Sequence, residues 1–357
     1  MKILFLYRYG ILGGVCTQLF HRFRHMSKER GIEIHCGFRS DHGVEAMLSP
    51  YATLHFGLNK ETTQTFLQEN HFDKIIIIDS EEYIQALREI EVSATIIVEV
   101  HTSIESNLEY LSRIEKTEIE ALVTVSEYMI GRIQHHIKQE LTDLHIHQFQ
   151  NVLDTEIFLP KKHNSEGHPV IAWVGKIDDH KDWKAFIKIS SEIHKVNSEI
   201  EFWIIGGQTC PENRVLEVFD FAEEMDILRR FRWIDRIENI KMPTLYSIVA
   251  QRGGLSLVTS HCESFGMSVL EALLTGCPVV SSKVGALPEI TPADTYFQLY
   301  PLHDYKEAAE LCLQVIENST DIQTSLSGLR PSLVDEYSSR IRSNEYWNLI
   351  ESLGDEK

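Results

Sequence analysis

Short runs of consecutive apolar residues recur along the first half of the chain, at intervals that leave room for helices. The run Ile75–Ile78 is apolar at every position rather than at alternate positions, which is typical of a parallel strand buried on both faces. The stretch Val15–Lys28 instead carries apolar residues near helical spacing, which predicts an amphipathic helix. The strands expected in this half are Ile3–Tyr7, Ile32–Phe38, Ile75–Asp79, Thr95–Val100 and Ala121–Val125.

The same pattern starts again after a polar segment, residues 160–167, whose Pro160 and Gly167 are typical of a linker. Two successive series of strands and helices predict an α/β protein with two doubly wound, Rossmann-like parallel sheets. Such sheets bind ligands beyond the carboxyl ends of their strands, so we expect the functional site in a cleft between the two domains. The strands expected in the second half are Val170–Val174, Glu201–Ile205, Leu255–Thr259 and Pro278–Ser282.

The length and the charge of the chain narrow the class of protein. The 357 residues exceed what one hydrophobic core usually supports, which favours two domains. The formal net charge of −19 repels a phosphate backbone, so we expect no nucleic-acid partner. The apolar run at residues 3–7 is too short for a signal peptide. No stretch approaches the roughly 20 apolar residues of a membrane span. The scattered cysteines without a CxxC pair lead us to expect a cytoplasmic protein.

The cysteines form neither a disulfide pattern nor a metal pattern. They are scattered and lack a CxxC pair, so we expect reduced, mostly buried thiols. The run His261-Cys262-Glu263 offers three kinds of metal ligand, but no second ligand cluster accompanies it, so we expect no metal site. The six cysteines are Cys16, Cys36, Cys210, Cys262, Cys277 and Cys312.

The clearest local motif follows the strand expected at Leu255–Thr259. A turn leads into a helix that starts near Gly266 and stops at Gly276. The first backbone N–H groups of this helix and its dipole would form a phosphate site. Glu263 precedes the helix, and Glu271 lies inside it, where a carboxylate can accept hydrogen bonds from paired hydroxyls. Alternatively, Glu263 caps the helix and Glu271 is a solvated surface residue.

Three further segments follow expected strands and are candidates for the same cleft. Lys176 and Lys181 share one strand-to-helix loop, where they neutralise a diphosphate or are simply solvated. Gly13 and Gly14 either let a ligand approach the backbone closely or form a plain tight turn. The G-x-G-x-x-G spacing that is typical of dinucleotide-binding proteins is absent here. His101 ends a buried strand and is either a polar site residue or a structural histidine.

These residues resemble family 4 retaining glycosyltransferases, which have the GT-B fold. The segment from Glu263 to Glu271 is similar to the paired-glutamate motif of that family. The resemblance spans nearly the whole chain and implies an N-terminal acceptor-side domain at 1–160, a donor domain at 161–335 and a C-terminal helix, within 336–357, that returns to the first domain. The other similar segments are Val123–Ser126, Asn151–Phe158, Gly175–Lys181, Gly276–Val280 and Gly285–Ile290.

The resemblance also implies roles for individual residues. Glu263 would face the hydroxyls of the donor sugar, Glu271 the ribose, and His101 the reacting carbon. The catalytic residues implied are His101, Glu263, Lys176 and Lys181. The residues implied to bind the nucleotide sugar are Gly13, Gly14, Lys176, Lys181, Trp233, Ile234, Glu263, Phe265, Gly266, Met267, Ser268 and Glu271. The last helix, expected at Val334–Leu353, would cross back to the first domain.

Two residues depart from the pattern of that family. The family commonly has arginine at the position of Lys176, and a lysine cannot make the bidentate contact of a guanidinium. The family also commonly has glycine after the second lysine, where this chain has Asp182. Both departures concern the geometry of the diphosphate contact rather than its charge.

The activity that the resemblance implies is transfer of a hexose, with retention of configuration, from a UDP- or GDP-type sugar. No cofactor and no metal are implied, because fixed amides and two lysines can stabilise the leaving diphosphate. The acceptor would be a glycan, a lipid-linked sugar or a small metabolite. The alternatives are a similar fold with other chemistry, as in a sugar-nucleotide epimerase or a phosphorylase, and a non-catalytic nucleotide-sugar-binding module.

The first expected helix suggests one further partner. Its basic residues around an apolar stripe would give weak, salt-sensitive contact with the anionic inner face of a membrane. The alternative is a solvated helix face, which the negative net charge favours. The basic residues concerned are Arg22, Arg24, His25, Lys28 and Arg30.

Overall fold

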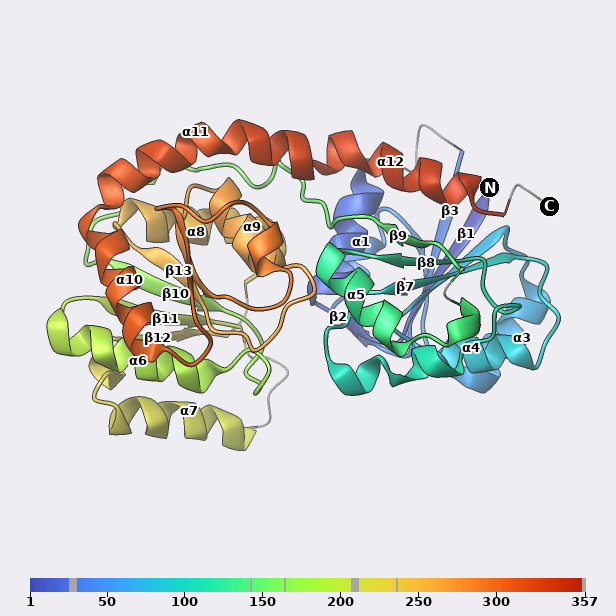
Figure 1. The fold of residues 1–357 in the computed structure, drawn as a ribbon, viewed down its shortest axis with the longest axis horizontal. Coiled ribbons are helices and arrows are strands. Elements are labelled where there is room, and N and C mark those ends of the chain that lie inside the picture. Colours follow the sequence, from blue (N-terminus) through green and yellow to red (C-terminus); the bar gives the residue numbers. More distant parts are fainter. Residues whose placement is uncertain (26–30, 142, 164, 207–211, 236, 355–357) are drawn as a thin grey trace. The chain divides into compact units, whose positions relative to one another are not determined.

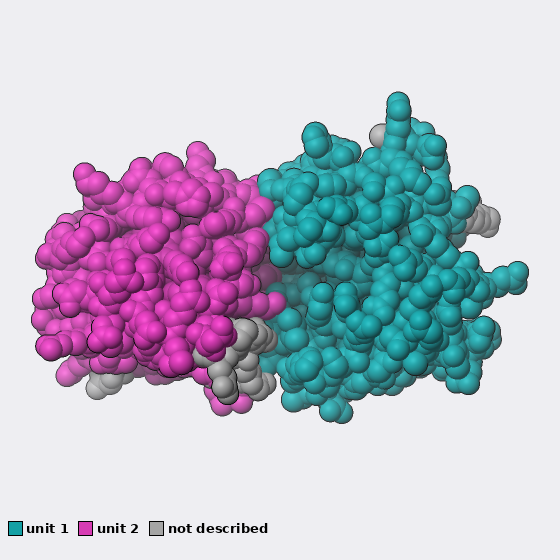
Figure 2. All heavy atoms as spheres, turned by 90° about the horizontal axis from the view of Figure 1, so that it is seen from below, with its two compact units in different colours: residues 1–154, 337–357 teal, residues 155–336 magenta. Residues whose placement is uncertain are grey.

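The computed structural model describes all residues except 26–30, 142, 164, 207–211, 236 and 355–357, and it divides into two compact units (Figure 2). The first unit comprises Met1–Asp154 and Tyr337–Lys357, and the second comprises Thr155–Glu336. The division after Asp154 falls slightly before the boundary expected at residue 160. The segment expected as a linker is attached to the second unit, because the backbone N–H of Lys161 donates to Ser247 Oγ at 2.9 Å.

The first unit is built on a parallel sheet with the strand order β5-β3-β1-β6-β7-β8-β9 (Figure 1). The order reverses at β1, which lies between β3 and β6, as in a doubly wound fold. The side chains of Ile75–Ile78 are all buried, which agrees with their uninterrupted apolar pattern. The strands of this unit are β1 (Lys2–Tyr7), β2 (Gly10–Ile11), β3 (Glu33–Gly37), β4 (Asp41–His42), β5 (Thr53–His55), β6 (Lys74–Ile78), β7 (Thr95–Val100), β8 (Ala121–Thr124) and β9 (Ile146–Gln148).

Most helices of the first unit connect these strands. The last helix of the chain also belongs to this unit, although the whole second unit separates it from them in the sequence. Trp347 of that helix is fully buried and lies edge-on to Phe5 of β1, with ring centroids 6.2 Å apart. The helices are α1 (Gly14–Arg24), α2 (Glu45–Leu48), α3 (Lys60–Glu69), α4 (Glu81–Arg88), α5 (Glu127–His136) and α12 (Ser339–Ser352), with 3₁₀ turns η1 (Glu105–Asn107), η2 (Glu109–Arg113) and η3 (Gln139–Leu141).

The second unit repeats the plan with a parallel sheet in the order β12-β11-β10-β13-β14-β15, which reverses at β10. Figure 1 shows α8 and α9 on one side of this sheet and α6 and α7 on the other. The strands are β10 (Val170–Val174), β11 (Glu201–Ile205), β12 (Phe231–Ile234), β13 (Leu255–Val258), β14 (Val279–Ser282) and β15 (Phe297–Tyr300). The helices are α6 (Trp183–Val196), α7 (Glu212–Glu224), α8 (Met242–Gln251), α9 (Met267–Leu274), α10 (Tyr305–Glu317) and α11 (Ser319–Tyr337), with 3₁₀ turns η4 (Leu228–Arg230), η5 (Asn239–Lys241) and η6 (Leu287–Glu289).

The end of the chain differs from the sequence-based expectation. The single helix expected at Val334–Leu353 is divided between α11 and α12, with a break at Ser338. The backbone of Ser338 is extended, at φ −63° and ψ 120°, and it forms a β-bridge with Leu153. The backbone N–H of Leu153 donates to Tyr337 O at 2.8 Å. Backbone contacts with this distant segment therefore interrupt a helix that the local sequence would continue.

The first helix is also shorter than expected. The helix expected at Val15–Lys28 is α1, which ends at Arg24 with His25 as its C-cap. Residues 26–30 lie outside the described part of the chain, so the last turn of the expected helix is not part of this description.

Candidate functional site

The carboxyl edge of the second sheet brings together two loops that the sequence analysis singled out. One loop follows β10 and the other follows β13, and these two strands are neighbours at the point where the strand order reverses. The backbone N–H of His261 donates to His180 O at 2.9 Å, and Trp173 Nε1 donates to Thr259 Oγ1 at 2.9 Å. The two loops are therefore tied to each other and to the sheet beneath them, at the place where doubly wound folds bind ligands.

Lys181 and Glu263 form the charged centre of this edge. Lys181 Nζ donates to Glu263 Oε1 at 2.5 Å, and Ser260 Oγ donates to the same oxygen at 2.6 Å. Burial alone would raise the pKa of Glu263, but the charge of Lys181 and these two hydrogen bonds outweigh it and lower the pKa. Glu263 is therefore an ionised carboxylate that is only 9% exposed.

Glu263 does not cap the helix that follows it. The N-cap of α9 is Gly266, and no side chain caps this helix end. The alternative interpretation of Glu263 as a capping residue is therefore wrong. Because the first turn of a helix leaves backbone N–H groups without intrahelical acceptors, the start of α9 at Met267 and Ser268 keeps donors for an anion.

Glu271 lies inside α9 and is buried, at 5% exposure, so the alternative interpretation as a solvated residue is also wrong. Asn239 Nδ2 donates to Glu271 Oε1 at 3.1 Å, and the Tyr246 hydroxyl lies 3.5 Å from Oε2. Burial raises the pKa of Glu271 to about 7, because these two neutral donors offset only part of the lost hydration. Its charge therefore depends on pH in the neutral range, unlike that of Glu263.

Two glycines let the backbone around Glu263 take its observed path. Gly266 has φ +107°, and a Cβ at this position would lie 2.4 Å from Leu287 Cδ2. Gly285 has φ +53°, and a Cβ there would lie 2.2 Å from the carbonyl oxygen of Glu263. Phe265, which precedes Gly266, is buried at 4% exposure. The turn that presents Glu263 is thus fixed by close packing from both sides.

The other expected nucleotide-binding residues of this unit lie at the same edge of the sheet. Lys176 is exposed in the loop after β10, one residue beyond Gly175. Trp233 and Ile234 end β12, and Trp233 Nε1 donates to Gly206 O at 2.8 Å. Gly206 has φ +113°, and a Cβ there would lie 2.4 Å from Gly175 O, so the ends of β10 and β11 approach closely. The structure thus gathers these residues, and their contacts with a nucleotide stay a prediction.

The departure at Asp182 has a conformational explanation. Asp182 has φ +50° and ψ +60°, in the left-handed region that glycine adopts most readily. Aspartate is among the few other residues that tolerate this region, and here its side chain also accepts a hydrogen bond from Ala185 N at 3.0 Å. Asp182 therefore keeps the turn that a glycine would make and adds an N-cap to α6.

In the first unit, His101 follows β7 and is held by a buried carboxylate. His101 Nε2 lies 2.9 Å from Glu99 Oε2, and Arg22 Nη1 donates to the same oxygen at 2.8 Å. Burial alone would raise the pKa of Glu99, but the charge of Arg22 and the hydrogen bonds of His101 and Tyr346 lower the pKa to about 2. Because the carboxylate is ionised, it can only accept, so His101 Nε2 donates the hydrogen bond between them.

The residues that support the candidates were not predicted from the sequence. Glu99 could have been found, since residues i and i+2 of a strand share one face and Glu99 precedes His101 by that spacing. Asn239 and Tyr246 carry no local signal, because they reach Glu271 from other elements. Gly13 is the extended N-cap of α1, and a Cβ at Gly14 would meet nothing within 4 Å, so the contacts of this turn with a ligand stay a prediction.

The basic residues of α1 do not form a free cationic face. Arg22 is fully buried against Glu99, which corrects the expectation that it is exposed. Arg24 Nε lies 2.7 Å from Asp154 Oδ2, and His25 Nε2 lies 3.1 Å from the same oxygen. The remaining basic residues of the membrane hypothesis, Lys28 and Arg30, lie outside the described residues. Within the described part of the chain, no helix is long and apolar enough to cross a membrane.

Comparison with known sequences finds a family that matches most of the second unit. Residues 154–326 match the family described as Glycosyl transferases group 1. The 2-deoxystreptamine glucosyltransferase of Streptomyces kanamyceticus is 26% identical over 172 residues, which are 48% of this chain and 42% of that protein. The 2-deoxystreptamine N-acetyl-D-glucosaminyltransferase of Niallia circulans is 25% identical over 187 residues, 52% of this chain and 46% of that protein. The alignments therefore span less than half the length of these relatives.

Comparison with solved structures covers nearly the whole chain. The crystal structure of Anabaena HepE in complex with UDP and glucose is similar with a TM-score of 0.83 and 15% identity, over 99% of this chain and 100% of that chain. Sucrose-phosphate synthase from Thermosynechococcus elongatus is similar with a TM-score of 0.78 and 13% identity, over 99% of this chain and 98% of that chain. The resemblance inferred from the sequence is thereby confirmed: the chain has the GT-B fold, and its residues 154–326 match the group 1 glycosyl transferase family.

Proposed function

We propose that this protein is a retaining glycosyltransferase that moves a hexose from a nucleoside-diphosphate sugar to an acceptor hydroxyl. The observation that carries the proposal is the pair of buried glutamates at one edge of the second sheet, Glu263 held by Lys181 and Glu271 inside α9. Burying a carboxylate costs free energy unless it is paired, and neither residue caps a helix. A ligand rich in hydroxyl groups would donate hydrogen bonds to both carboxylates.

The donor would bind along this edge in a fixed order. Lys181 and Lys176 would neutralise the diphosphate, together with the backbone N–H groups at the start of α9. Glu271 would accept hydrogen bonds from the ribose, and Glu263 would accept them from the sugar. Trp233 and Ile234, at the end of β12, would approach the base. The HepE complexes contain UDP or UDP-glucose, so these two molecules are the first ligands to test.

The proposed reaction keeps the configuration of the sugar. The bond between the anomeric carbon and the phosphate oxygen breaks, and the acceptor oxygen bonds to that carbon on the same face. The proton of the acceptor hydroxyl passes to the leaving phosphate, so no protein base is required. Lysine side chains and backbone amides stabilise the developing negative charge, and the chemistry needs no metal ion. His101 would lie beside the reacting carbon, and the acceptor would be a glycan, a lipid-linked sugar or a small metabolite.

A thermal-shift screen tests the proposal directly. A ligand that binds only the folded protein raises its apparent stability, so the correct nucleoside diphosphate should raise Tm. The screen compares UDP, GDP and ADP with the corresponding nucleosides and nucleotide sugars. We expect one diphosphate to raise Tm far more than its nucleoside, because the lysines contact the phosphates. A screen in which no diphosphate and no nucleotide sugar changes Tm would contradict the proposed function.

A further inference from the structure

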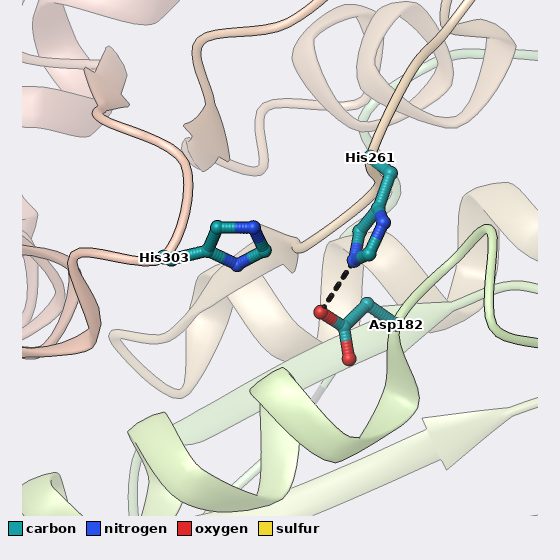
Figure 3. Close-up of side chains that lie close together, drawn as sticks. All are labelled: Asp182, His261 and His303. Atoms are coloured by element: carbon teal, nitrogen blue, oxygen red, sulfur yellow. Dashed lines mark hydrogen bonds and ion pairs between the residues drawn. The ribbon is translucent and has the colours of Figure 1, made fainter.

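Three metal-ligating side chains meet beside the proposed donor site, from three separate loops of the second unit. Asp182 follows β10, His261 follows β13 and His303 follows β15 (Figure 3). Each offers one ligand atom, and the three atoms lie within 4.8 Å of one another. His261 Nε2 lies 2.8 Å from Asp182 Oδ2, and the rings of His261 and His303 are nearly perpendicular, with centroids 5.4 Å apart.

The backbones that carry these side chains are fixed. The Asp182 carboxylate is oriented because its Oδ1 accepts from Ala185 N at 3.0 Å, which leaves Oδ2 to face His261. The Thr259 hydroxyl is shared between the carbonyls of Lys181 and Asp182, at 2.8 and 2.9 Å. His303 has φ +71° in the turn before α10, where its carbonyl accepts from Tyr305 N at 3.0 Å. On these backbones, rotation of the imidazole rings would let the three ligand atoms face one ion.

We propose that Asp182, His261 and His303 bind one divalent transition-metal ion of the zinc type. Two imidazole nitrogens and one carboxylate oxygen are the ligands that Zn²⁺ takes in sites with an open position. Bonds of about 2.1 Å in a tetrahedron place ligand atoms about 3.4 Å apart, a separation between the 2.8 Å of the His261–Asp182 pair and the 4.8 Å within which all three atoms lie. The side chain of His261 is 44% exposed, so an ion can enter and keep water as its fourth ligand.

The position of the cluster gives the ion a structural effect. Asp182 directly follows Lys181, and His261 precedes Glu263 by two residues. A bound ion would therefore clamp the two loops that carry the charged pair to the turn before α10. The ion would stabilise these loops without taking part in sugar transfer. This site differs from the run His261-Cys262-Glu263, because its other ligands come from distant parts of the sequence.

The experiment uses the untagged full-length protein after treatment with a chelator. Co²⁺ is titrated as an optical probe, and Zn²⁺ is then added as a competitor and in thermal-shift measurements. His303→Asn removes one ligand, and Asp182→Asn removes the carboxylate. Asparagine tolerates the left-handed backbone at both positions, so the turns are preserved. His168→Asn is the matched control, because His168 is 45% exposed and also pairs with a carboxylate, Glu199, at 3.0 Å, but joins no group of three ligands among the described residues.

We expect one Co²⁺ per chain with visible d–d absorption, displacement by Zn²⁺, and a rise in Tm with Zn²⁺. The two ligand variants should weaken binding by roughly 100-fold or more, since even the loss of a residue that only supports a ligand costs about 10- to 100-fold. The control variant, His168→Asn, should bind Co²⁺ as tightly as the unchanged protein does. The proposal is overturned if the unchanged protein binds no ion, or if His303→Asn binds as tightly as the control. Nucleotide affinity of metal-free His303→Asn should equal that of the metal-free unchanged protein, so this test is independent of the proposed function.

Discussion

Glu271 shows how burial sets the charge of a residue in the proposed donor site. Its pKa is raised from 4.5 to about 7 because the carboxyl group is buried in α9. Between these two values the folded state keeps a proton that the unfolded state loses. The stability that this proton provides is present below pH 4.5 and is lost as pH rises through 7.

Glu271→Gln, which cannot ionise, should therefore gain stability relative to the unchanged protein as pH rises. At about 1.4 kcal/mol per pH unit, the difference in the free energy of unfolding should grow by roughly 3 kcal/mol between pH 4.5 and pH 8. Urea unfolding of both proteins at several pH values measures it. A difference that stays constant from pH 5 to pH 8 would show that Glu271 titrates at its ordinary pKa.

Glu99 is the counter-charge of a buried guanidinium in the first unit. The side chains of Arg22 and Glu99 are each 1% exposed, and the guanidinium also lies over the Tyr346 ring at 4.2 Å from its centroid. Among the described residues, Nε and Nη2 of Arg22 have no hydrogen-bond partner. Removing the carboxylate charge would leave this cation buried without compensation.

Glu99→Gln should therefore destabilise the protein by about 3–5 kcal/mol, as when one partner of a buried ion pair is removed. Glu105→Gln is the matched control, because Glu105 is 68% exposed in its ion pair with Arg132 and should cost under about 1 kcal/mol. Urea unfolding measures both changes. Equal effects of the two substitutions would mean that the Arg22–Glu99 pair contributes no more than a surface pair does.

The residues of the proposed donor site were more predictable than their supporting contacts. Lys176, Lys181 and Glu263 stood out because they lie in loops that follow strands, and Glu271 stood out because it lies in the helix after Glu263. The meeting of Asp182, His261 and His303 was not predictable, because their spacing in the sequence says nothing about three loops folding together. Burial also decides charge: the sequence alone does not distinguish the ionised Glu263 from Glu271, whose pKa is raised.

At the scale of elements, the start of α9 depends on Gly266. A side chain there would need a positive φ and would overlap Leu287. Gly266→Ala should cost about 2–4 kcal/mol of stability from backbone strain and overpacking together, and it should weaken binding of a diphosphate at this helix end.

Gly328→Ala is the control for this substitution. Gly328 lies inside α11, and a Cβ there would meet nothing within 4 Å. Alanine should therefore raise stability by about 0.5–1 kcal/mol, because it lowers the entropy cost of forming the helix. Thermal unfolding compares the two variants. A Gly266→Ala protein as stable as Gly328→Ala would show that the positive φ at Gly266 is not required.

The elements themselves were predictable to different degrees. Buried central strands such as β6 and β10 are predictable because each is a continuous apolar run in the sequence. The short strands β5, β9, β12 and β15 were not predicted, because strands at or near the rim of a sheet carry only part of that pattern. The break between α11 and α12 was also missed, since it depends on pairing of Ser338 with Leu153.

At the scale of the whole molecule, the chain forms its first unit from both of its ends. Trp347 of α12 is fully buried in this unit, whereas the proposed donor site belongs to the second unit. Trp347→Ala should cost about 3–5 kcal/mol, as for other large side chains removed from a core. Because the donor site is elsewhere, the affinity of the folded protein for the nucleoside diphosphate should stay unchanged.

Ile341→Ala on the same helix is the control, because Ile341 is 49% exposed and should change stability by no more than about 0.5 kcal/mol. Unfolding curves with and without the nucleotide measure both quantities. A Trp347→Ala protein that keeps its stability, or that loses nucleotide affinity while folded, would contradict this assignment of α12 to the first unit alone.

The central claim is that Glu271 binds the nucleotide and Glu263 binds the sugar. Calorimetry of UDP and of a UDP-sugar with the unchanged protein, Glu263→Ala and Glu271→Ala tests it most directly. At pH 8, where Glu271 is ionised, we predict that Glu271→Ala weakens binding of UDP by about tenfold to a hundredfold, through lost hydrogen bonds to a charged group. Glu263→Ala should keep or raise the affinity for UDP, because Lys181 is released for the diphosphate. The same variant should weaken only the binding of the UDP-sugar. Loss of UDP affinity in Glu263→Ala but not in Glu271→Ala, or no change in either variant, would contradict the account.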